Sequence, residues 1–565
     1  MRKMKQIFLL ISFIVFGNVL IAQSIDDGKK FLNYEKYISA QNVFSKLVAA
    51  NPNDVEAVYW LGQTYLENED NTDTAAAKAL YQKTLQANPN APLLIVGMGE
   101  IDLMEGRKED ARNKFETAIS IPKKKDVAPI LTAVGRANIG VKGGDMVYAI
   151  DKLNQAADKD KKNVDIQILL GDAYRRLIDG ANATIAYQTA LAIDPKCARA
   201  DFMIGRIYET QGYGQEPLYM RYYNAAIDAD PNFAPVYYWL YQYYYQRDVN
   251  KSREYLDKYI AVADPEPKNC YYLASILYAS KLYNDAIAKA NDCIAKDSKN
   301  PYPNLYGIKA YAYDKMGDSI NAKANFEQFF AIANPDKIGP NDYATYGRIL
   351  LKYPAKDAAD SARNDTLATT YIDKGIALDT AMSDKLDIIK STAESLVASQ
   401  RYGDAAKWYT KALYLKKDYG KVDLYYAGYD DYRAGNYQGA DSVFGLYMQK
   451  YPDDIFGAYM RARANEGIDT AGTLGLAKPF YQKVIELADS SQEKTATIKA
   501  YETTAYRYMV AYSYNIQHNA PSAIEWNSKI LALDPADAQA LANDKALRAK
   551  PASKSSKDNT PQEKK

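Results

Sequence analysis

Residues 164–197 read VDIQILLGDAYRRLIDGANATIAYQTALAIDPKC, and this stretch decides the fold. Its small, aromatic and proline residues fall at regular places: Leu170, Gly171, Tyr174, Ala183, Tyr187, Ala190 and Pro195. Gly171 and Ala183 have little or no side chain, so two helices that carry them can approach closely, and Tyr187 can fill the space beside their contact. Pro195 lacks an amide proton and cannot continue a helix. The stretch therefore predicts two antiparallel helices followed by a turn.

The same arrangement recurs along the chain. Three stretches repeat it clearly: 55–91 with Gly62, Ala77, Tyr81 and Pro89; 421–454 with Gly428, Ala440, Phe444 and Pro452; and 504–537 with Ala511, Tyr514, Ala523 and Pro535. Weaker copies fill the remainder, which gives about 14 units over residues 25–537 and a final capping helix at 538–549. One helix pair cannot bury its apolar faces alone, so neighbouring pairs must stack.

This period of about 34 residues resembles the tetratricopeptide repeat family over almost the whole chain after residue 25. The resemblance implies an all-α fold, a right-handed superhelical α-solenoid of about 14 helix pairs with a concave groove. It also implies protein–protein scaffolding and no chemistry. In architecture and N-terminal signal, the chain is most similar to exported envelope repeat proteins of Gram-negative bacteria.

Irregular stretches suggest how the array is divided. Pro335 to Pro340 and a predicted long loop at 352–366 indicate a bend, which separates an N-terminal array at 25–335 from a C-terminal array at 341–549. A second irregular stretch, Gly467 to Gly475, is rich in glycine and threonine. Residues 550–565 contain almost nothing apolar, so we expect a disordered tail.

The first 22 residues have the pattern of an export signal. A basic start is followed by the apolar run Ile7 to Ile21 and by Ala22, a small residue suited to cleavage. The run of about 15 residues is shorter than the about 20 that a membrane-spanning helix needs. We expect a cleaved signal peptide, with an uncleaved anchor as the alternative. No later stretch is apolar enough to span a bilayer. The expected location is the periplasm or the periphery of the outer membrane, where partners can hold the protein at a membrane.

Charge and composition argue against several functions. Without the three basic residues of the first 22, the chain has 68 basic and 70 acidic residues, and this balance gives no electrostatic case for nucleic acid. The one histidine, His518, lies in a polar turn without a visible catalytic or metal-binding partner. There is no glycine-rich phosphate loop and no nucleophile elbow. The sequence predicts no enzyme activity, no cofactor and no metal.

Three cysteines raise the question of a disulfide. Cys197 lies in a turn between repeats, whereas Cys270 and Cys293 lie on the two predicted helices of one unit, facing its interior. An exported protein can form a disulfide here. Two buried free thiols are the favoured alternative, because cysteine packs well as a small hydrophobic residue.

Tyrosine is unusually abundant, with 51 residues. In the run 237–245 we expect Leu240 and Tyr244 in the core of their pair and Tyr238 and Tyr245 on the groove. The full set of candidate groove residues is Phe202, Tyr238, Tyr245, Tyr271, Tyr278, Tyr425, Tyr429 and Tyr432. These aromatics either pack between neighbouring units or form anchors for a ligand. The leading hypothesis is an exported scaffold that binds proteins in the groove, and the alternative is a glycan-binding module.

One known mode of peptide binding is not expected. Relatives that clamp a C-terminal carboxylate place lysines and asparagines on successive first helices, according to the family resemblance. Here the equivalent places hold Ile168 and Asp172, Phe202 and Arg206, and Tyr238 and Gln242. A carboxylate-clamp co-chaperone is therefore not predicted.

Overall fold

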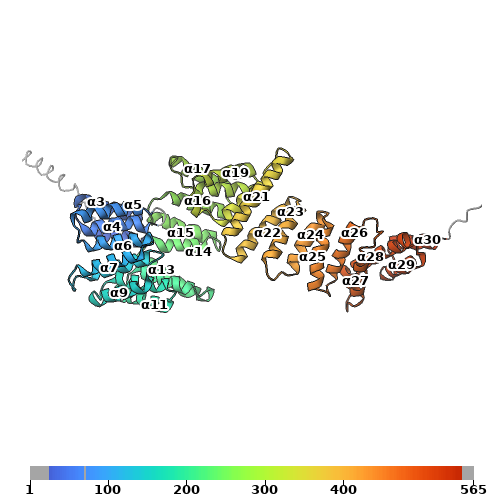
Figure 1. Ribbon diagram of the computed structural model, residues 1–565, viewed down its shortest axis with the longest axis horizontal. Coiled ribbons are helices and arrows are strands. Elements are labelled where there is room, and N and C mark those ends of the chain that lie inside the picture. Colours follow the sequence, from blue (N-terminus) through green and yellow to red (C-terminus); the bar gives the residue numbers. More distant parts are fainter. Residues whose placement is uncertain (1–23, 69–71, 550–565) are drawn as a thin grey trace, which may run out of the picture. The chain divides into compact units, whose positions relative to one another are not determined.

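The computed structural model describes residues 24–68 and 72–549, and every regular element in these ranges is a helix (Figure 1). This confirms the predicted all-α class. The helices pair in chain order, α2 with α3 through to α28 with α29, and α30 follows the last pair. The predicted signal peptide at 1–22 and the predicted tail at 550–565 lie outside the described residues.

The chain forms two compact units, which divide at residues 308 and 309. Unit 1 contains α2 (Ile25–Asn33), α3 (Tyr37–Ala50), α4 (Val55–Glu67), α5 (Thr74–Ala87), α6 (Pro92–Met104), α7 (Lys108–Ser120), α8 (Ala128–Gly140), α9 (Met146–Lys159), α10 (Val164–Arg176), α11 (Gly180–Ile193), α12 (Ala198–Glu209), α13 (Glu216–Ala229), α14 (Ala234–Tyr244), α15 (Val249–Val262), α16 (Pro267–Ala279) and α17 (Tyr283–Lys296).

The division falls within α18 (Asn304–Lys315). Unit 2 continues with α19 (Ser319–Ile332), α20 (Pro340–Lys352), α21 (Ala358–Leu378), α22 (Met382–Ala398), α23 (Tyr402–Leu415), α24 (Lys421–Arg433), α25 (Tyr437–Lys450), α26 (Ile455–Ile468), α27 (Lys478–Asp489), α28 (Ala496–Ala511), α29 (Ala520–Leu533) and α30 (Ala538–Arg548). The boundary expected at 335–341 therefore lies inside unit 2, between α19 and α20.

The loop expected at 352–366 is wrong. Residues from Ala358 onward form α21, a helix of 21 residues, and only a short link separates it from α20. Asp357 starts the helix by accepting a hydrogen bond from the amide of Asp360 at 2.8 Å. An N-terminal cap of this kind satisfies an amide that would otherwise lack a partner. The polar composition of the stretch hid this start signal.

Close approach of the paired helices depends on a glycine facing an aromatic ring. A Cβ atom added to Gly171 would lie 2.3 Å from the Tyr187 ring, which is fully buried. The same contact occurs in other pairs: Gly28 with Phe44, Gly62 with Tyr81, Gly99 with Phe115, Gly205 with Tyr223 and Gly428 with Phe444. These contacts fix the distance between the two helices of the six pairs named.

The pair α14–α15 reverses this arrangement. Tyr241 takes the place of the glycine and is buried, and the smaller Leu256 takes the place of the ring. Ser252 donates a hydrogen bond to the Tyr241 carbonyl at 2.9 Å. Tyr244, which we expected in the core, is only half-buried and stacks on Tyr255 at the edge of the pair, with centroids 5.7 Å apart. Tyr241 already fills the interior, so no room remains there for a second ring.

The pair α16–α17 has neither glycine nor ring at these places. Ala274 and Ala290 are both fully buried, and both are small. A disulfide joins Cys270 on α16 to Cys293 on α17. The favoured expectation of two free thiols is thus corrected, because the cysteines face each other across a gap that no large side chain fills.

The last pair also departs from the expected register. A π-helical turn at Tyr512–Ile516 follows α28 and adds a residue to the pattern. As a result Ala511 and Tyr514, expected in the core, are exposed, and Ser513 is buried instead. The C-terminal helix α30 covers α29, and the amide of Asn527 donates to the carbonyl of Ala540 at 2.8 Å.

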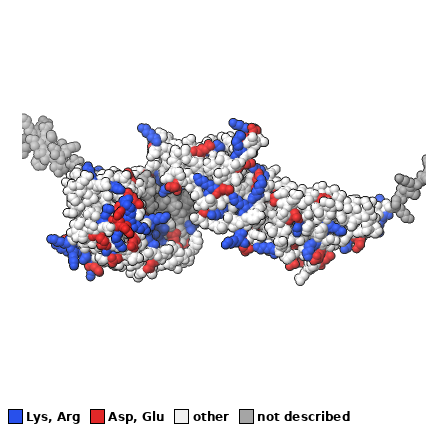
Figure 2. Space-filling model, in the orientation of Figure 1, with Lys and Arg blue, Asp and Glu red and all other residues white. Residues whose placement is uncertain are grey.

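Charge and hydropathy add two general features. Figure 2 shows acidic and basic side chains intermixed over the visible face of each unit. Within the ranges 24–68 and 72–549, no helix combines the length and the apolar composition that a membrane span requires.

Candidate functional site

The first helix pair of unit 1 closes back on helices that follow much later in the chain. Lys29 on α2 pairs with Asp165 at 3.5 Å. Arg199 on α12 donates a hydrogen bond to the side-chain carbonyl oxygen of Asn33 at 3.2 Å. Tyr34, just after α2, donates a hydrogen bond to Asp230. Burial raises the pKa of this aspartate, but the hydrogen bonds from Tyr34, Asn232 and Lys30 outweigh it and hold the pKa at about 2.

A buried carboxylate completes the closure. The amides of Ile38 and Ser39, in the first turn of α3, donate to Asp264 at 2.8 and 3.1 Å. Lys36, the residue at the cap of α3, provides no side-chain hydrogen bond of its own. Asp264 therefore caps α3 from the link between α15 and α16, where a negative charge also favours the helix dipole. Asp264 itself is held by Asn269, whose amide donates to its carbonyl at 2.8 Å.

The inner faces of the first helices of unit 1 line a row of cavities beside these contacts. We use the name inner channel for three neighbouring cavities in unit 1, of about 230, 410 and 300 Å³. The first and middle cavities share Arg136, and the middle and last cavities share Glu35 and Tyr37. The middle and last cavities are in the range of those that hold small ligands, about 300 to 1,000 Å³, and the first is smaller.

An indole ring, that of Trp60, lines the first cavity. The guanidinium of Arg136 lies 5.1 Å from the centroid of the Trp60 ring, and the ammonium of Lys29 lies 5.4 Å from it. Such cation–π contacts are favourable, most of all for tryptophan. The Trp60 side chain is thereby held between two basic residues from α2 and α8.

The middle cavity is lined by four arginines and four carboxyl groups. Its charged residues are Arg136, Arg175, Arg176, Arg199, Glu35, Glu67, Glu100 and Asp172. Arg199 pairs with Asp172 at 2.8 Å and Arg136 pairs with Glu67 at 3.6 Å. In the ranges that the structure describes, no carboxylate forms an ion pair with Arg175 or Arg176, and both side chains are exposed toward the cavity.

Glu100 lies in the wall of the middle cavity and is almost completely buried. The amide of Gln63 donates to its carboxyl group at 2.7 Å. Burial raises the pKa of Glu100 to about 7, since removal from water disfavours the charged form; Gln63 and Arg136 oppose this shift and Glu67 adds to it.

The last cavity is lined by tyrosines. Tyr238 lies here, half-buried, with its ring centroid 5.3 Å from Tyr259 and 5.5 Å from Tyr272. Tyr238 is the one predicted groove residue that lines the inner channel.

The other predicted residues of unit 1 lie elsewhere. Phe202 is buried between Phe233 and Tyr223, with centroids 5.7 and 5.8 Å away. The prediction that Phe202 lies on an open groove is wrong. Tyr34, which follows α2, packs on Phe233 and covers this region. The remaining three predicted residues, Tyr245, Tyr271 and Tyr278, are half-buried and pack against neighbouring residues. Tyr245 donates a hydrogen bond to the Ser275 carbonyl at 3.0 Å. Tyr271 contacts Tyr272 and Tyr302, and Tyr278 contacts Tyr283.

In unit 2, the predicted residues share one helix, α24. Tyr425 is exposed by 36% and stacks on Tyr429, with centroids 5.2 Å apart. Tyr432 is half-buried and accepts a hydrogen bond from Arg463 at 3.1 Å. The stacked rings of Tyr425 and Tyr429 contact each other along the helix.

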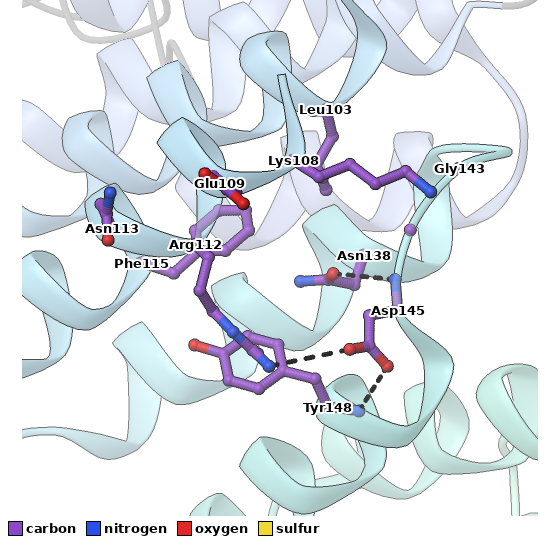
Figure 3. A pocket seen from close by; sticks show the side chains of 11 residues that line it. Leu103, Lys108, Glu109, Arg112, Asn113, Phe115, Asn138, Gly143, Asp145 and Tyr148 are labelled. Carbon is purple, nitrogen blue, oxygen red and sulfur yellow. Dashed lines mark hydrogen bonds and ion pairs between the residues drawn. The ribbon is translucent and has the colours of Figure 1, made fainter. Parts of the chain in front are cut away.

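A separate cavity of about 590 Å³ lies between α6–α7 and α8–α9 (Figure 3). Its Arg112 side chain lies over the Tyr148 ring, 3.3 Å from the centroid, and pairs with Asp145 at 3.7 Å. Asp145 in turn accepts from the Tyr148 amide at 3.0 Å. Arg112 and Asp145 are thus engaged with each other and with Tyr148, and we assign this cavity no ligand.

Nothing in the described part of the chain groups histidine, cysteine or acidic residues as a metal site would. His518 is exposed in the turn before α29, as expected. Models of the tetratricopeptide repeat match residues 29–92, which cover α2 to α5, and residues 303–336, which cover α18 and α19. The first match includes the pairs α2–α3 and α4–α5, whose glycine–ring contacts are described above.

This chain contains tetratricopeptide repeats.

Known proteins with similar repeats come from several sources. Human tetratricopeptide repeat protein 6 is 27% identical over 173 residues, which are 31% of this chain and 32% of the human protein. The chain therefore spans about a third of the length of that curated relative. Among solved structures, the C-terminal part of a repeat-containing protein from Cytophaga hutchinsonii is 26% identical and covers 48% of this chain and 98% of its own, with a TM-score of 0.32. A repeat protein from Parabacteroides merdae is 17% identical over 53% and 97%, with a TM-score of 0.29.

Repeats of this family form protein-interaction scaffolds and typically have no enzymatic activity. Several residues that line the channel lie at the same position of their repeats. In four of the first helices, the residue directly after the small residue lines the channel: Lys29, Glu100, Arg136 and Asp172. This spacing could have identified Arg136 from the sequence, but not Arg175, Arg176 or Arg199, which lie at other positions of their helices.

Proposed function

We propose that this protein is an exported scaffold of the cell envelope, which binds an extended segment of a partner protein in the inner channel of unit 1. The observation that carries the proposal is the channel itself, which lies beside the contacts of α2 and α3 with later helices and is lined by both charged and aromatic side chains. Cavities of about 230 to 410 Å³ suit a few residues of an extended chain and not a folded domain.

The export and envelope parts rest on the N-terminal sequence pattern. A basic start, an apolar run and a small residue at position 22 favour export. Cell fractionation with mass measurement of the N-terminus tests this part: we expect a chain that begins near Gln23 outside the cytoplasm. A cytoplasmic protein that retains Met1 would contradict it.

The binding part is tested by crosslinking in the native envelope. A photoreactive amino acid at position 238 lies in the last cavity, and the same amino acid at position 185 lies on α11, where Ile185 is exposed by 59%. We expect discrete protein adducts from position 238 and not from position 185. Equal adduct patterns from both positions, or no protein adduct from position 238, would refute binding in the channel.

A further inference from the structure

We infer that the segment bound in the middle cavity is acidic, and that its carboxylates are bound by Arg175 and Arg176. This inference rests on the proposed function, since it names the chemistry of the partner segment. Arg175 and Arg176 are the last two residues of α10, and both line the middle cavity.

The four arginines of the middle cavity differ in whether they have a carboxylate partner. Arg199 and Arg136 have carboxylate partners within unit 1, at 2.8 and 3.6 Å. Across residues 24–68 and 72–549, none of the ion pairs or side-chain hydrogen bonds involves Arg175 or Arg176. Two guanidinium groups that share a cavity and lack an anion can bind one from outside, and arginine forms paired hydrogen bonds with carboxylates.

A further positive charge, that of Arg206, interacts with Arg175. Arg206 on α12 is half-buried, and its guanidinium lies over the Trp239 ring, 3.3 Å from the centroid. Burial lowers the pKa of Arg206, and the positive charge of Arg175 lowers it further. Two carboxyl groups, Glu209 at 3.9 Å from Arg206 and Glu35, oppose this effect on the pKa of Arg206. An incoming carboxylate would relieve the repulsion between Arg175 and Arg206.

The surrounding carboxyl groups favour a peptide over a nucleic acid. Glu35, Glu67 and Asp172 line the same cavity and would repel a continuous chain of phosphates. A peptide can place a single carboxylate beside Arg175 and Arg176 and neutral residues beside the acidic groups. The aromatic residues at either end of the channel, Trp60 and Tyr238, suit apolar or aromatic side chains of the same segment.

The test uses the full chain and fluorescence anisotropy with labelled probes. One probe is a ten-residue peptide of glutamate and serine with a central phenylalanine, the second has glutamine for every glutamate, and the third is a ten-nucleotide oligothymidine. We expect the acidic peptide to bind at least about tenfold more tightly than the glutamine peptide, the effect of losing one charge-assisted hydrogen bond.

The variant R175Q/R176Q should remove this preference. The matched control is K161Q/K162Q, which makes the same change of charge at two exposed lysines in the turn before α10, outside the channel. Thermal unfolding of both variants by circular dichroism checks that each is folded. A preference that persists in R175Q/R176Q, equal binding of the two peptides, or failure of the acidic peptide to bind would overturn the inference. So would tighter binding of the oligonucleotide that is lost in R175Q/R176Q.

The outcome separates this inference from the proposed function. If position 238 still crosslinks to protein partners while the two peptides bind alike, the inner channel binds partners but does not select for acidity. If the acidic peptide binds through Arg175 and Arg176 and no partner crosslinks in the envelope, the site chemistry stands and the proposed scaffold role fails.

Discussion

At the scale of single residues, Glu100 shows how burial in the channel wall determines a measurable property. Burial raises the pKa of its carboxyl group to about 7 from an ordinary value of 4.5. The folded state therefore keeps a proton that the unfolded state has lost between these two pH values. The stabilising contribution is complete below about pH 4.5 and is lost as the pH rises through about 7.

We expect Glu100→Gln to remove this pH dependence. The range corresponds to about 3 kcal/mol, at about 1.4 kcal/mol for each pKa unit. The glutamine variant should therefore gain stability relative to the unmodified protein as the pH rises from 5 to 8. Thermal unfolding at several pH values measures this difference. The control is Glu109→Gln, on the exposed face of α7, and identical pH profiles for Glu100→Gln and the unmodified protein would contradict the expectation.

At the scale of helices and pairs, most of the fold could be predicted because the decisive contacts are local. Gly171 and Tyr187 lie in the same pair, so their spacing alone predicted the contact that the structure shows. Predictions failed where one residue changed the local rule. Asp357 starts a helix in a stretch that resembles a loop, and Tyr241 occupies the place of a glycine and excludes Tyr244 from the core.

The disulfide joins α16 to α17, a pair that has small residues on both helices where they meet. Ala274 and Ala290 leave no ring between α16 and α17, so we expect the Cys270–Cys293 bond to stabilise this pair. Replacing both cysteines with serine should cost about 3 kcal/mol, the stabilisation typical of a disulfide that closes a loop of this length.

Hydrogen exchange measures this effect locally. Amides of α16 and α17 should lose protection in C270S/C293S, while those of α10 and α11 should not, because each pair contacts mainly its neighbours. Cys197→Ser is the matched control, since Cys197 is the free cysteine among the described residues. Unchanged protection of α16 and α17 would show that packing alone holds this pair together.

At the scale of the whole molecule, the closure of unit 1 is the feature that the sequence did not predict. The contacts of Tyr34 with Asp230 and of Ser39 with Asp264 join residues about two hundred positions apart. Their formation depends on the small rotations between successive pairs, which add up over several repeats and have no signature in any one repeat. The repeat pattern thus predicted the paired helices, whereas the channel follows only from the summed geometry.

If partners bind in the inner channel of unit 1, filling the channel should prevent their binding. Gly140, at the end of α8, lines the middle cavity, and a Cβ atom there would meet only the Glu100 carboxyl group, at 3.4 Å. Gly140→Trp therefore puts a large ring into the cavity without disturbing a helix contact. Gly214→Trp adds the same ring where nothing lies within 4 Å. We predict that Gly140→Trp lowers the yield of partner adducts from a photoreactive residue at position 238 at least about tenfold, with an unchanged melting temperature, while Gly214→Trp leaves the yield unchanged. An undiminished yield in Gly140→Trp would show that partners do not bind in the inner channel.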